Sequence, residues 1–545
     1  MNRIKEYLSK DLNKYRFIAL LIFIGIITVL AWQSDDAYHA YIMAKNLVDG
    51  NGFVYNIGER ATASSCPLFT LVIAGAYFIT REMFFTSLAV CIIFSSIAFH
   101  IVLKYFCKST AQIAVALIVL GGSASFVSYT TSGLENSMLF CLTAIFLKIY
   151  FENDTFDTKK LFIEALLVSL IAMTRMDAVL MVAPIAVYIY LARRDKVSFI
   201  KAVGLGILGL LPFILWEVFA TFYFGFPFPN TAYAKLGTNI SLMEYIVRGV
   251  KYYLNALLCD PVILIVPLMA FAGAVYSRCA KYLVCVSGIV IYALYLLYIG
   301  GDFMMGRHFT VMFLIAVICC LAICNSADIS SERIRNKEKL CKAAAIIACA
   351  CVAIAMLLRP ITDEFLYGHK YSSPISDERA GYFAYSSMFD NIMSLRTKGE
   401  LCIRDAWNEE GVRELRGFSF DGGILDNCPG ITRYYNQDLY LNDRYALGDP
   451  FLSHLPAVHE PNWRIGHMWR EVPAGYRETV WVRDGENNIE NEDLKQYYEV
   501  IKLITRGDLF NRDRIKAIID MNTGKYDYLI DNYVSTLDEN GQSIQ

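Results

Sequence analysis

Apolar segments recur along the chain as far as Leu358, and the residues beyond it form a mostly polar region. A membrane-spanning helix needs about 20 predominantly apolar residues, so this pattern predicts a multi-pass membrane protein. The shorter apolar run Leu68–Thr80 is expected to form an interfacial or re-entrant helix. We expect eleven spans, at about 17–33, 85–103, 111–130, 134–151, 161–174, 177–192, 200–222, 259–277, 282–300, 308–325 and 341–358.

Lysine and arginine residues gather in loops on one side of this arrangement, as is typical of the cytoplasmic side of a membrane. With eleven spans, the N-terminus is also expected in the cytoplasm and the C-terminal region outside it. No small-residue cleavage site follows the first span, so we expect that span to be retained. The charged loops contain Lys104, Lys108, Lys159, Lys160, Arg193, Arg194, Lys196, Lys201, Arg278, Lys281, Arg333, Arg335, Lys337, Lys339 and Lys342.

The change from apolar to polar sequence near residue 360 predicts two domains. Residues 1–359 would form an α-helical membrane domain, and residues 360–545 an extracytoplasmic mixed α/β domain of ordinary size. We expect helices over Asp493–Asn532. The tryptophans of this domain could stack on sugars, although such residues more often form a domain core. Cys402 and Cys428 could form a disulfide if the domain lies outside the cell.

Composition supports the membrane assignment. The chain has 545 residues, of which 56% are hydrophobic and only 19% are charged, and this excludes an ordinary soluble enzyme. Its net charge of -2 gives no indication of a nucleic-acid partner.

The loop of residues 34–67 carries the most unusual polar sequence next to a span. Asp35 and Asp36 stand where the first span ends, and a short amphipathic helix is expected from about Ala37 to Val48, ended by Gly50 and Gly52. Two interpretations are open. A pair of acids at a membrane exit is costly and therefore indicates function. Alternatively, Ser34, Asp35 and Asp36 cap the helix and complement its dipole.

The same topology brings several other polar segments to the outer face. They include Thr131–Glu135, Arg175–Asp177, Phe226–Lys235 and Gly300–His308. The topology was derived from lysines and arginines in other loops, so this convergence is independent of it. It predicts an active site on the extracytoplasmic side of the membrane.

These segments supply carboxylates and cations but no familiar nucleotide or zinc motif. A glycosyl transfer from a lipid-phosphate donor needs such a set. A carboxylate deprotonates the acceptor or attacks the anomeric carbon, and cations hold the departing phosphate. Snorkelling at span ends is the alternative explanation for the cations. The carboxylates are Asp35, Asp36, Glu135, Asp177 and Asp302, and the cations are Arg175, Lys235, Arg307 and His308.

Several motifs occur in the order found in a known family. DDAYHAYIMAKNLVDGNGFVYNIGER, TSGLEN, TRMDA, FYFGFPFPNTAYAKL and GGDFMMGRH are followed by DRYALGDPFLSHLPA and WRIGHMWREVPAGYRE. On these motifs the chain resembles membrane glycosyltransferases of the GT-C superfamily, in particular the terminal arabinofuranosyltransferases of actinobacterial cell walls. The resemblance covers nearly the whole chain. The segments around FPNTAYAK and WRIGH are its most specific parts.

The resemblance implies a polyprenyl-phosphate-linked sugar donor, with arabinofuranose as the sugar, and a polysaccharide acceptor outside a bacterial plasma membrane. It assigns catalysis to Asp35 or Asp36, and it implies that the outer C-terminal domain helps to hold the acceptor. Donor phosphate would contact Arg175, Lys235, Arg307 and His308. Substrate would contact Glu135, Asp177, Asn230, Tyr233 and Asp302. The sequence leaves open whether Mg²⁺ or Ca²⁺ assists as a cofactor.

The resemblance to arabinosyl relatives implies net retention of the anomeric configuration. A double displacement would then need a carboxylate nucleophile and a separate base. Neighbouring helix residues point about 100° apart, so Asp35 and Asp36 are not expected to serve the same face of the sugar. We expect one of them to face the anomeric centre while the other binds acceptor hydroxyls or a cation. Asp177 or Asp302 would assist.

Three alternatives are open. The donor could carry another sugar, such as mannose or an aminopentose. A lipid-linked sugar flippase would show paired half-repeats and polar residues at mid-membrane depth, and the sequence displays neither. A scaffold protein would have little use for a cluster of carboxylates and arginines.

Overall fold

The computed structural model describes residues 2–194, 197–236, 238, 240–326, 331–367, 374–403, 424–426, 430–436, 439–461, 463–481, 485–538 and 541–542. Helices make up 71% of the structure. The strands in these ranges are β1 (Ile424–Asp426) and β2 (Tyr440–Asn442), which pair in parallel. The predicted mostly helical class is therefore confirmed, and the separate mixed α/β domain at the C-terminal end stays a prediction. Cys428 and Trp407 lie outside the described residues.

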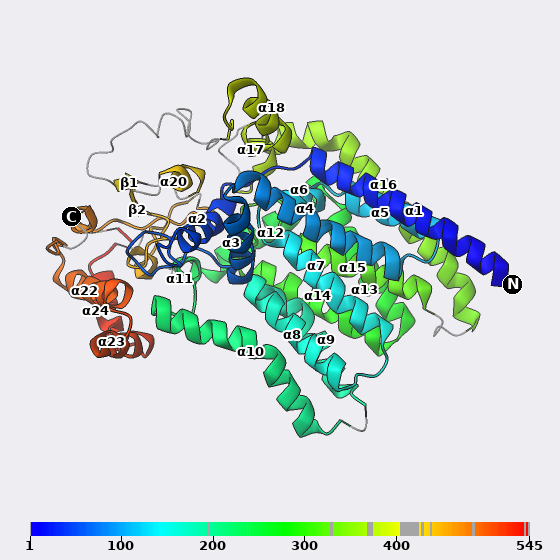
Figure 1. Cartoon of the computed structure of the whole chain (residues 1–545), viewed down its shortest axis with the longest axis horizontal. Helices are drawn as coiled ribbons and strands as arrows, with labels where there is room; N and C mark the ends of the chain where they lie inside the picture. The colour runs from blue at the N-terminus through cyan, green and yellow to red at the C-terminus, as the bar shows by residue number, and fades with distance from the viewer. Residues whose placement is uncertain are drawn as a thin grey trace.

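Helices occupy every position where the apolar pattern predicts a span, although the expected span 111–130 is divided into two helices bent by 74°. One helix, Leu242–Cys259, lies where no span was predicted. The helices run side by side in a bundle (Figure 1). They are α1 (Asn2–Val29), α4 (Phe84–Ile101, continued by a π-helical turn), α5 (Thr110–Gly122), α6 (Ala124–Thr131), α7 (Asn136–Glu152), α8 (Thr158–Thr174), α9 (Val179–Leu191), α10 (Phe199–Phe224), α12 (Leu242–Cys259), α13 (Val262–Ser277), α14 (Ala280–Tyr298), α15 (Phe309–Asn325) and α16 (Ser331–Tyr367).

In the part of the chain described here, five of these helices are long and apolar enough to cross a membrane. Two bent pairs, α5 with α6 and α12 with α13, raise the number to seven if each pair is one span. Several other helices, such as α15, are apolar but shorter. The chain therefore has the features of a membrane protein, and the count of eleven spans stays a prediction.

The two bent pairs meet at a buried carboxylate. Asp260 lies in the break between α12 and α13, where the axes turn by 101°. Its Oδ2 accepts hydrogen bonds from Ser123 Oγ at 2.7 Å and from the Ser125 backbone N–H at 2.8 Å, in the 74° break between α5 and α6. The second bond satisfies the Ser125 N–H, one of the free N–H groups at the start of α6, and the two bonds together link the two breaks. They fix the direction of α6, which leads to the segment that carries Glu135.

Short helices close one end of the bundle. They are α2 (Ala37–Val48), α3 (Pro67–Thr80) and α11 (Asn230–Leu236) (Figure 1). The α2 bounds are those predicted, and Gly50 follows with a φ of 86° that favours glycine. Gln33 anchors the loop before α2, since its Nε2 donates to Ser87 Oγ and its Oε1 accepts from the Tyr38 hydroxyl.

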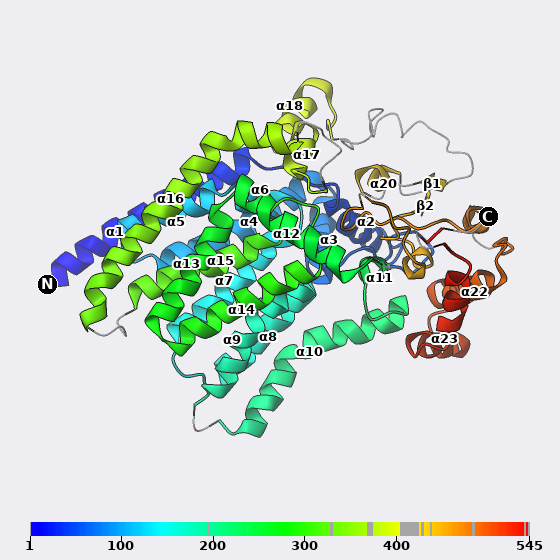
Figure 2. The same ribbon diagram turned by 180° about the vertical axis from the view of Figure 1, so that it is seen from behind.

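The C-terminal region lies beyond this end of the bundle, and the two termini lie at opposite ends of the molecule (Figure 2). The predicted helical stretch is confirmed. The elements of the region are α17 (Glu378–Ser386), α18 (Met388–Lys398), α20 (Ile431–Tyr435), α21 (Tyr476–Trp481), α22 (Glu492–Arg506), α23 (Arg512–Asn522) and α24 (Asp527–Val534). Trp463 is only 3% exposed, which agrees with a role in the core.

Hydrogen bonds join the C-terminal region to the loop of residues 34–67. Asn56 Nδ2 donates to the Leu441 carbonyl at 3.3 Å, and Leu441 N–H donates to Asn56 Oδ1 at 3.1 Å. Buried Glu59 accepts from Arg506 Nη2 at 3.1 Å and from the Tyr440 hydroxyl at 3.1 Å. The two segments, nearly 400 residues apart in sequence, therefore form one polar joint over the end of the bundle.

Candidate active site

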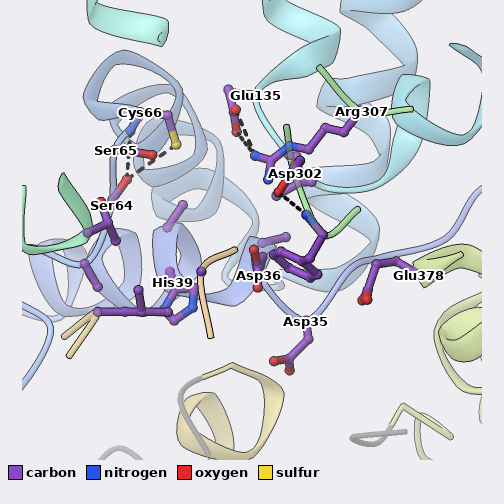
Figure 3. A pocket seen from close by; sticks show the side chains of 18 of the residues that line it. Asp35, Asp36, His39, Ser64, Ser65, Cys66, Glu135, Asp302, Arg307 and Glu378 are labelled. Atoms are coloured by element: carbon purple, nitrogen blue, oxygen red, sulfur yellow. Dashed lines mark hydrogen bonds and ion pairs between the residues drawn. The ribbon is translucent and has the colours of Figure 1, made fainter. Parts of the chain in front are cut away.

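A cavity of about 400 Å³ lies where the end of the bundle, α2 and the C-terminal region meet. Figure 3 shows side chains from these elements pointing into it. Among the residues predicted from sequence, the cavity lining includes Asp35, Asp36, Glu135, Arg175, Lys235, Asp302, Arg307 and His308. Segments from five distant parts of the chain thus meet around one space.

The two neighbouring aspartates have different surroundings. Asp35 Oδ1 accepts a hydrogen bond from the Ile431 backbone N–H at 2.6 Å, at the start of α20. A side chain on Gly430 would collide with the Asp35 carboxylate, so the C-terminal region approaches closely there. Asp35 therefore helps to hold this region against the bundle.

Asp36 is the carboxylate available to a ligand. It is the N-cap of α2 by position, but its side chain makes no capping hydrogen bond. No hydrogen bond or ion pair engages its carboxylate within the described residues, although it lines the cavity. Its charge nevertheless acts on the pKa of Glu378 and His467 across the cavity. The capping interpretation therefore does not account for Asp36.

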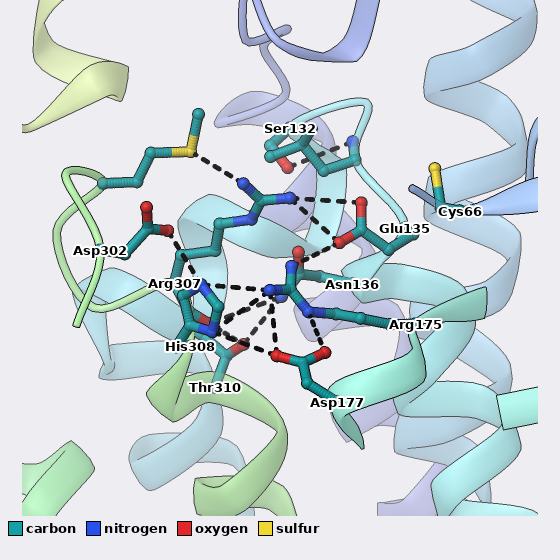
Figure 4. A network of polar contacts seen from close by, with 12 residues as sticks. Cys66, Ser132, Glu135, Asn136, Arg175, Asp177, Asp302, Arg307, His308 and Thr310 are labelled. Atoms are coloured by element: carbon teal, nitrogen blue, oxygen red, sulfur yellow. Dashed lines mark hydrogen bonds and ion pairs between the residues drawn. The ribbon is translucent and has the colours of Figure 1, made fainter. Parts of the chain in front are cut away.

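A buried ion-pair network forms the bundle side of the cavity (Figure 4). Glu135 is 2% exposed and accepts from two arginines. Arg175 Nη1 lies 2.9 Å from Glu135 Oε1, and Arg307 Nη2 lies 3.0 Å from the same atom and 3.3 Å from Oε2. Such charge-assisted bonds hold guanidinium groups in fixed orientations.

The network continues away from Glu135. Arg175 binds Asp177 in a bidentate manner, with Nε–Oδ1 at 2.7 Å and Nη2–Oδ2 at 3.1 Å. The Tyr292 hydroxyl also donates to Asp177, at 3.2 Å. His308 Nε2 lies 3.2 Å from Asp302 Oδ2. Most hydrogen bonds of these side chains are therefore made within the cluster.

Asp302 is held as a carboxylate. Burial alone would raise its pKa, but His308, Arg307 and Lys235 outweigh burial and keep the pKa of Asp302 well below its usual value. Its Oδ1 accepts from the Phe303 N–H at 2.8 Å. A charged Asp302 in turn supplies negative charge beside His308 and Lys235.

Lys235 is the cation with the most freedom to bind an anion. Its side chain lines the cavity and is exposed there. In the described ranges its ammonium has no ion pair or hydrogen bond, whereas Arg175 and Arg307 are both bound to Glu135. Lys235 is therefore available to an anionic ligand, and Arg175 and Arg307 line the same cavity in fixed positions.

The structure leaves three predicted residues out of the cavity lining. Asp177 lies in the ion-pair network beneath it. Asn230 is 2% exposed at the start of α11, where its backbone N–H donates to the Thr62 carbonyl. Tyr233 packs its ring against Phe226 and His454. On so short a helix, Thr231 and Lys235 share the cavity face, and Tyr233 faces the other way.

Several lining residues were not singled out from the sequence. Tyr445, Arg464 and His467 lie within the two C-terminal motifs that carry the family resemblance, so those motifs could have indicated them. His39 lies one turn after Asp36 on α2, and neither of its ring nitrogens has a partner among the described residues. Glu378 is in a stretch with no recognisable motif, so no sequence signal indicated it.

An apolar groove of about 460 Å³ adjoins the cavity. The two share Ser64, Ser65, Arg175, Thr231 and Lys235, so Lys235 stands at their junction. The groove is lined by the ends of α8, α9 and α10 and by the loop before α11. Its apolar side chains include Ala172, Met173, Met176, Leu180, Phe213, Trp216, Ala220, Phe224, Phe226 and Phe228.

The described residues contain no group of three or more His, Cys, Asp or Glu side chains arranged to hold a metal ion. The positively charged side chains that line the cavity are those of Arg175, Arg307, Lys235 and Arg464.

Comparison with known proteins adds no assignment: no family model, no curated protein and no solved structure matches this chain.

Proposed function

We propose that this protein is a membrane glycosyltransferase of the GT-C type, which transfers a sugar from a polyprenyl-phosphate donor to a polysaccharide. The observation that carries the proposal is the junction of a charged cavity with an apolar groove at Lys235. A lipid-linked sugar phosphate has three matching parts in the same order: a polar sugar, a charged phosphate and an apolar lipid. Its sugar would occupy the cavity, its phosphate would contact Lys235, and its lipid would follow the groove.

The roles of the side chains follow from their contacts. Asp36, free of protein partners in the described residues, faces the reacting sugar. Lys235 binds the phosphate and neutralises the charge that grows on it as it leaves, and the positive field of Arg175 and Arg307 assists. Asp35, bonded to Ile431, holds the C-terminal region over the cavity. That region would then contact the acceptor glycan, as the resemblance implies.

Arabinofuranose is the proposed donor sugar, on the strength of the resemblance to the arabinofuranosyltransferases. The resemblance also supports a bacterial plasma membrane, a cytoplasmic N-terminus and a C-terminal region outside the cell. Another lipid-linked sugar, such as mannose or an aminopentose, would use the same groove and the same phosphate contact. A flippase is less well supported, because the polar cluster lies at one end of the bundle.

The test is transfer of labelled sugar from a panel of polyprenyl-phosphate sugars to a short arabinan by the purified protein. We expect transfer from the arabinofuranose donor, and a loss of about 1,000-fold or more in D36N. D35N is the matched control. It removes the charge of the neighbouring carboxylate, which binds the Ile431 backbone N–H. It should keep transfer within about tenfold. Transfer by D36N at the parental rate, or no transfer from any donor, would contradict the proposal.

A further inference from the structure

Glu378 is a buried carboxyl group in the cavity that the roles above do not use. It is the first residue of α17 and is 6% exposed. The chain before it is fixed by two backbone hydrogen bonds, Met305 N–H to the Ser376 carbonyl at 3.0 Å and Ser376 N–H to the Phe303 carbonyl at 2.7 Å. Glu378 is therefore held beside the segment that carries Asp302. It faces the cavity from a different element than Asp36 does (Figure 3).

The Glu378 carboxyl has no hydrogen bond or ion pair within the described residues. The charged groups around it are Asp36 before α2, Asp302 after α14, Asp377 on its own turn, and Arg464 from the C-terminal region. Burial and the three carboxylates raise the pKa of Glu378 to about 8, and Arg464 opposes them. The pKa of Asp302, another carboxyl group that lines the cavity, is shifted in the opposite direction. Carboxyl groups whose environments separate their pKa values in this way can divide acid and base roles.

Building on the proposed function, we infer that Glu378 is the general base of a double displacement in which Asp36 is the nucleophile. The geometry carries this assignment. Asp36 and Glu378 are carboxyl groups from separate elements that face one cavity, and the carboxylate of neither has a protein partner in the described residues. Asp35 is bonded to Ile431. Asp302 has one oxygen 3.2 Å from His308 Nε2 and accepts from the Phe303 N–H with the other, and Asp177 is bound to Arg175.

The first step makes a glycosyl ester. An Asp36 oxygen attacks the anomeric carbon while the bond from that carbon to the phosphate oxygen breaks. The electron pair leaves with polyprenyl phosphate, whose charge Lys235 offsets. The sugar is then bonded to Asp36 with inverted configuration.

The second step makes the product. The acceptor hydroxyl oxygen attacks the anomeric carbon, and its proton passes to the Glu378 carboxylate. The bond to Asp36 breaks, and the electron pair returns to the Asp36 carboxylate. A second inversion restores the donor configuration, and Glu378 then releases its proton to solvent.

The charges support this order of events. In the free enzyme a protonated Glu378 does not repel the negatively charged donor. Once Asp36 is an ester it carries no charge, so one cause of the raised pKa of Glu378 is removed. Glu378 then ionises more readily at the stage where a base is needed. A base with a pKa near the working pH is the most effective kind.

The first experiment compares the parent, E378Q and a matched control, D390N, with the arabinofuranose donor. Asp390 is an exposed carboxylate on α18 that lies outside the cavity lining. We expect E378Q to slow transfer by about 100-fold or more while it accumulates a glycosyl ester on Asp36, detected by mass spectrometry after denaturation. D390N should match the parent. Binding of polyprenyl phosphate checks that E378Q is folded.

The second experiment adds azide, a nucleophile that needs no base. We expect azide to restore turnover of E378Q and to give a glycosyl azide with the configuration of the donor. Parental transfer by E378Q, or an inactive but folded E378Q with neither ester nor azide product, would overturn the role of Glu378 and leave the proposed function standing. Failure of the parent to transfer any sugar of the panel would overturn both.

The pH dependence of the parent tests the role of Glu378 even if the E378Q protein does not fold. A base acts only when deprotonated, and the pKa of Glu378 is raised to about 8. The rate at saturating donor should therefore rise with pH and level off below about 8, because the uncharged ester on Asp36 lowers the pKa of Glu378 at the stage where the base acts. With azide as acceptor this rise should disappear. A rise that persists with azide would overturn the assignment.

Discussion

The two walls of the cavity use charge in opposite ways. On the bundle side, Glu135, Arg175, Asp177 and Arg307 are bound to one another at 2.7–3.3 Å. On the opposite side, the described residues offer no protein partner to the side chains of Asp36, Lys235 or Glu378. The first wall resembles the interior of a stable protein, where buried charges are paired. The second has the unpaired groups expected where a charged ligand binds.

The paired and the unpaired side chains are therefore suited to different roles. A carboxylate already bound to two guanidinium groups is poorly suited to attack a sugar. Arg175, which is bound to both Glu135 and Asp177, is poorly placed to bind a phosphate in addition. The paired wall orients the site and sets its potential. In the proposed function, the unpaired wall exchanges protons and contacts the substrate. Four substitutions test this comparison.

Breaking the paired wall should have the largest effect. E135Q removes the charge that Arg175 and Arg307 share and leaves two buried guanidinium groups underpaired. We expect the free energy of unfolding to fall by about 3 kcal/mol and activity to be lost with it, measured by thermal unfolding in detergent and by transfer assay. E152Q changes a half-exposed carboxylate on the same helix and should be neutral. An E135Q protein of parental stability would show that the pairing is not structural.

K235M should separate activity from stability. Lys235 has no ion pair within the described residues to lose, so the melting temperature should stay close to that of the parent. Loss of the phosphate contact should reduce kcat/KM by about 100-fold. K251M, an exposed lysine on α12, is the control. A large drop in stability without a change in kcat/KM would show that Lys235 has a structural role and does not bind the phosphate.

N56A should loosen the joint that closes the cavity. Asn56 exchanges two hydrogen bonds with Leu441 and accepts one from Arg433 Nη2 at 3.3 Å. We expect a stability loss of about 2 kcal/mol and a fall in transfer of about tenfold, because the C-terminal lining would be less well held. N51A, in the same loop, is the comparison. Hydrogen exchange at β2 that is the same in N56A as in the parent would argue against this joint.

Y233F should have the smallest effect. The Tyr233 ring packs 4.7 Å from the His454 ring, and phenylalanine preserves that packing. We expect transfer and stability to remain within about twofold of the parent. A tenfold or greater loss of transfer would return Tyr233 to the substrate-binding residues that the sequence proposed.

Local features of the chain could be predicted well from the sequence. The bounds of α2, the helices at every expected span and the C-terminal helical stretch follow from residues close together in sequence, where periodicity and glycine stops are sufficient. The meeting of Asp36, Lys235 and Arg307 in one cavity followed from topology, because loops that leave a bundle at the same end lie near each other. The position of Glu378 in the cavity could not be predicted in this way, because Glu378 follows the last span and belongs to no motif.

By itself, the sequence determined the helical class, the polar segments that converge at one end, and the residue types available there. Only the tertiary structure decided what each of those residues contacts. It joined Asp35 to Ile431 across 396 positions and left its neighbour Asp36 facing the cavity. It bound Arg175 to Glu135 across 40 positions, and so left Lys235 as the available cation. Pairing depends on distances between segments that no local pattern encodes, and pairing divides these charges between support and chemistry.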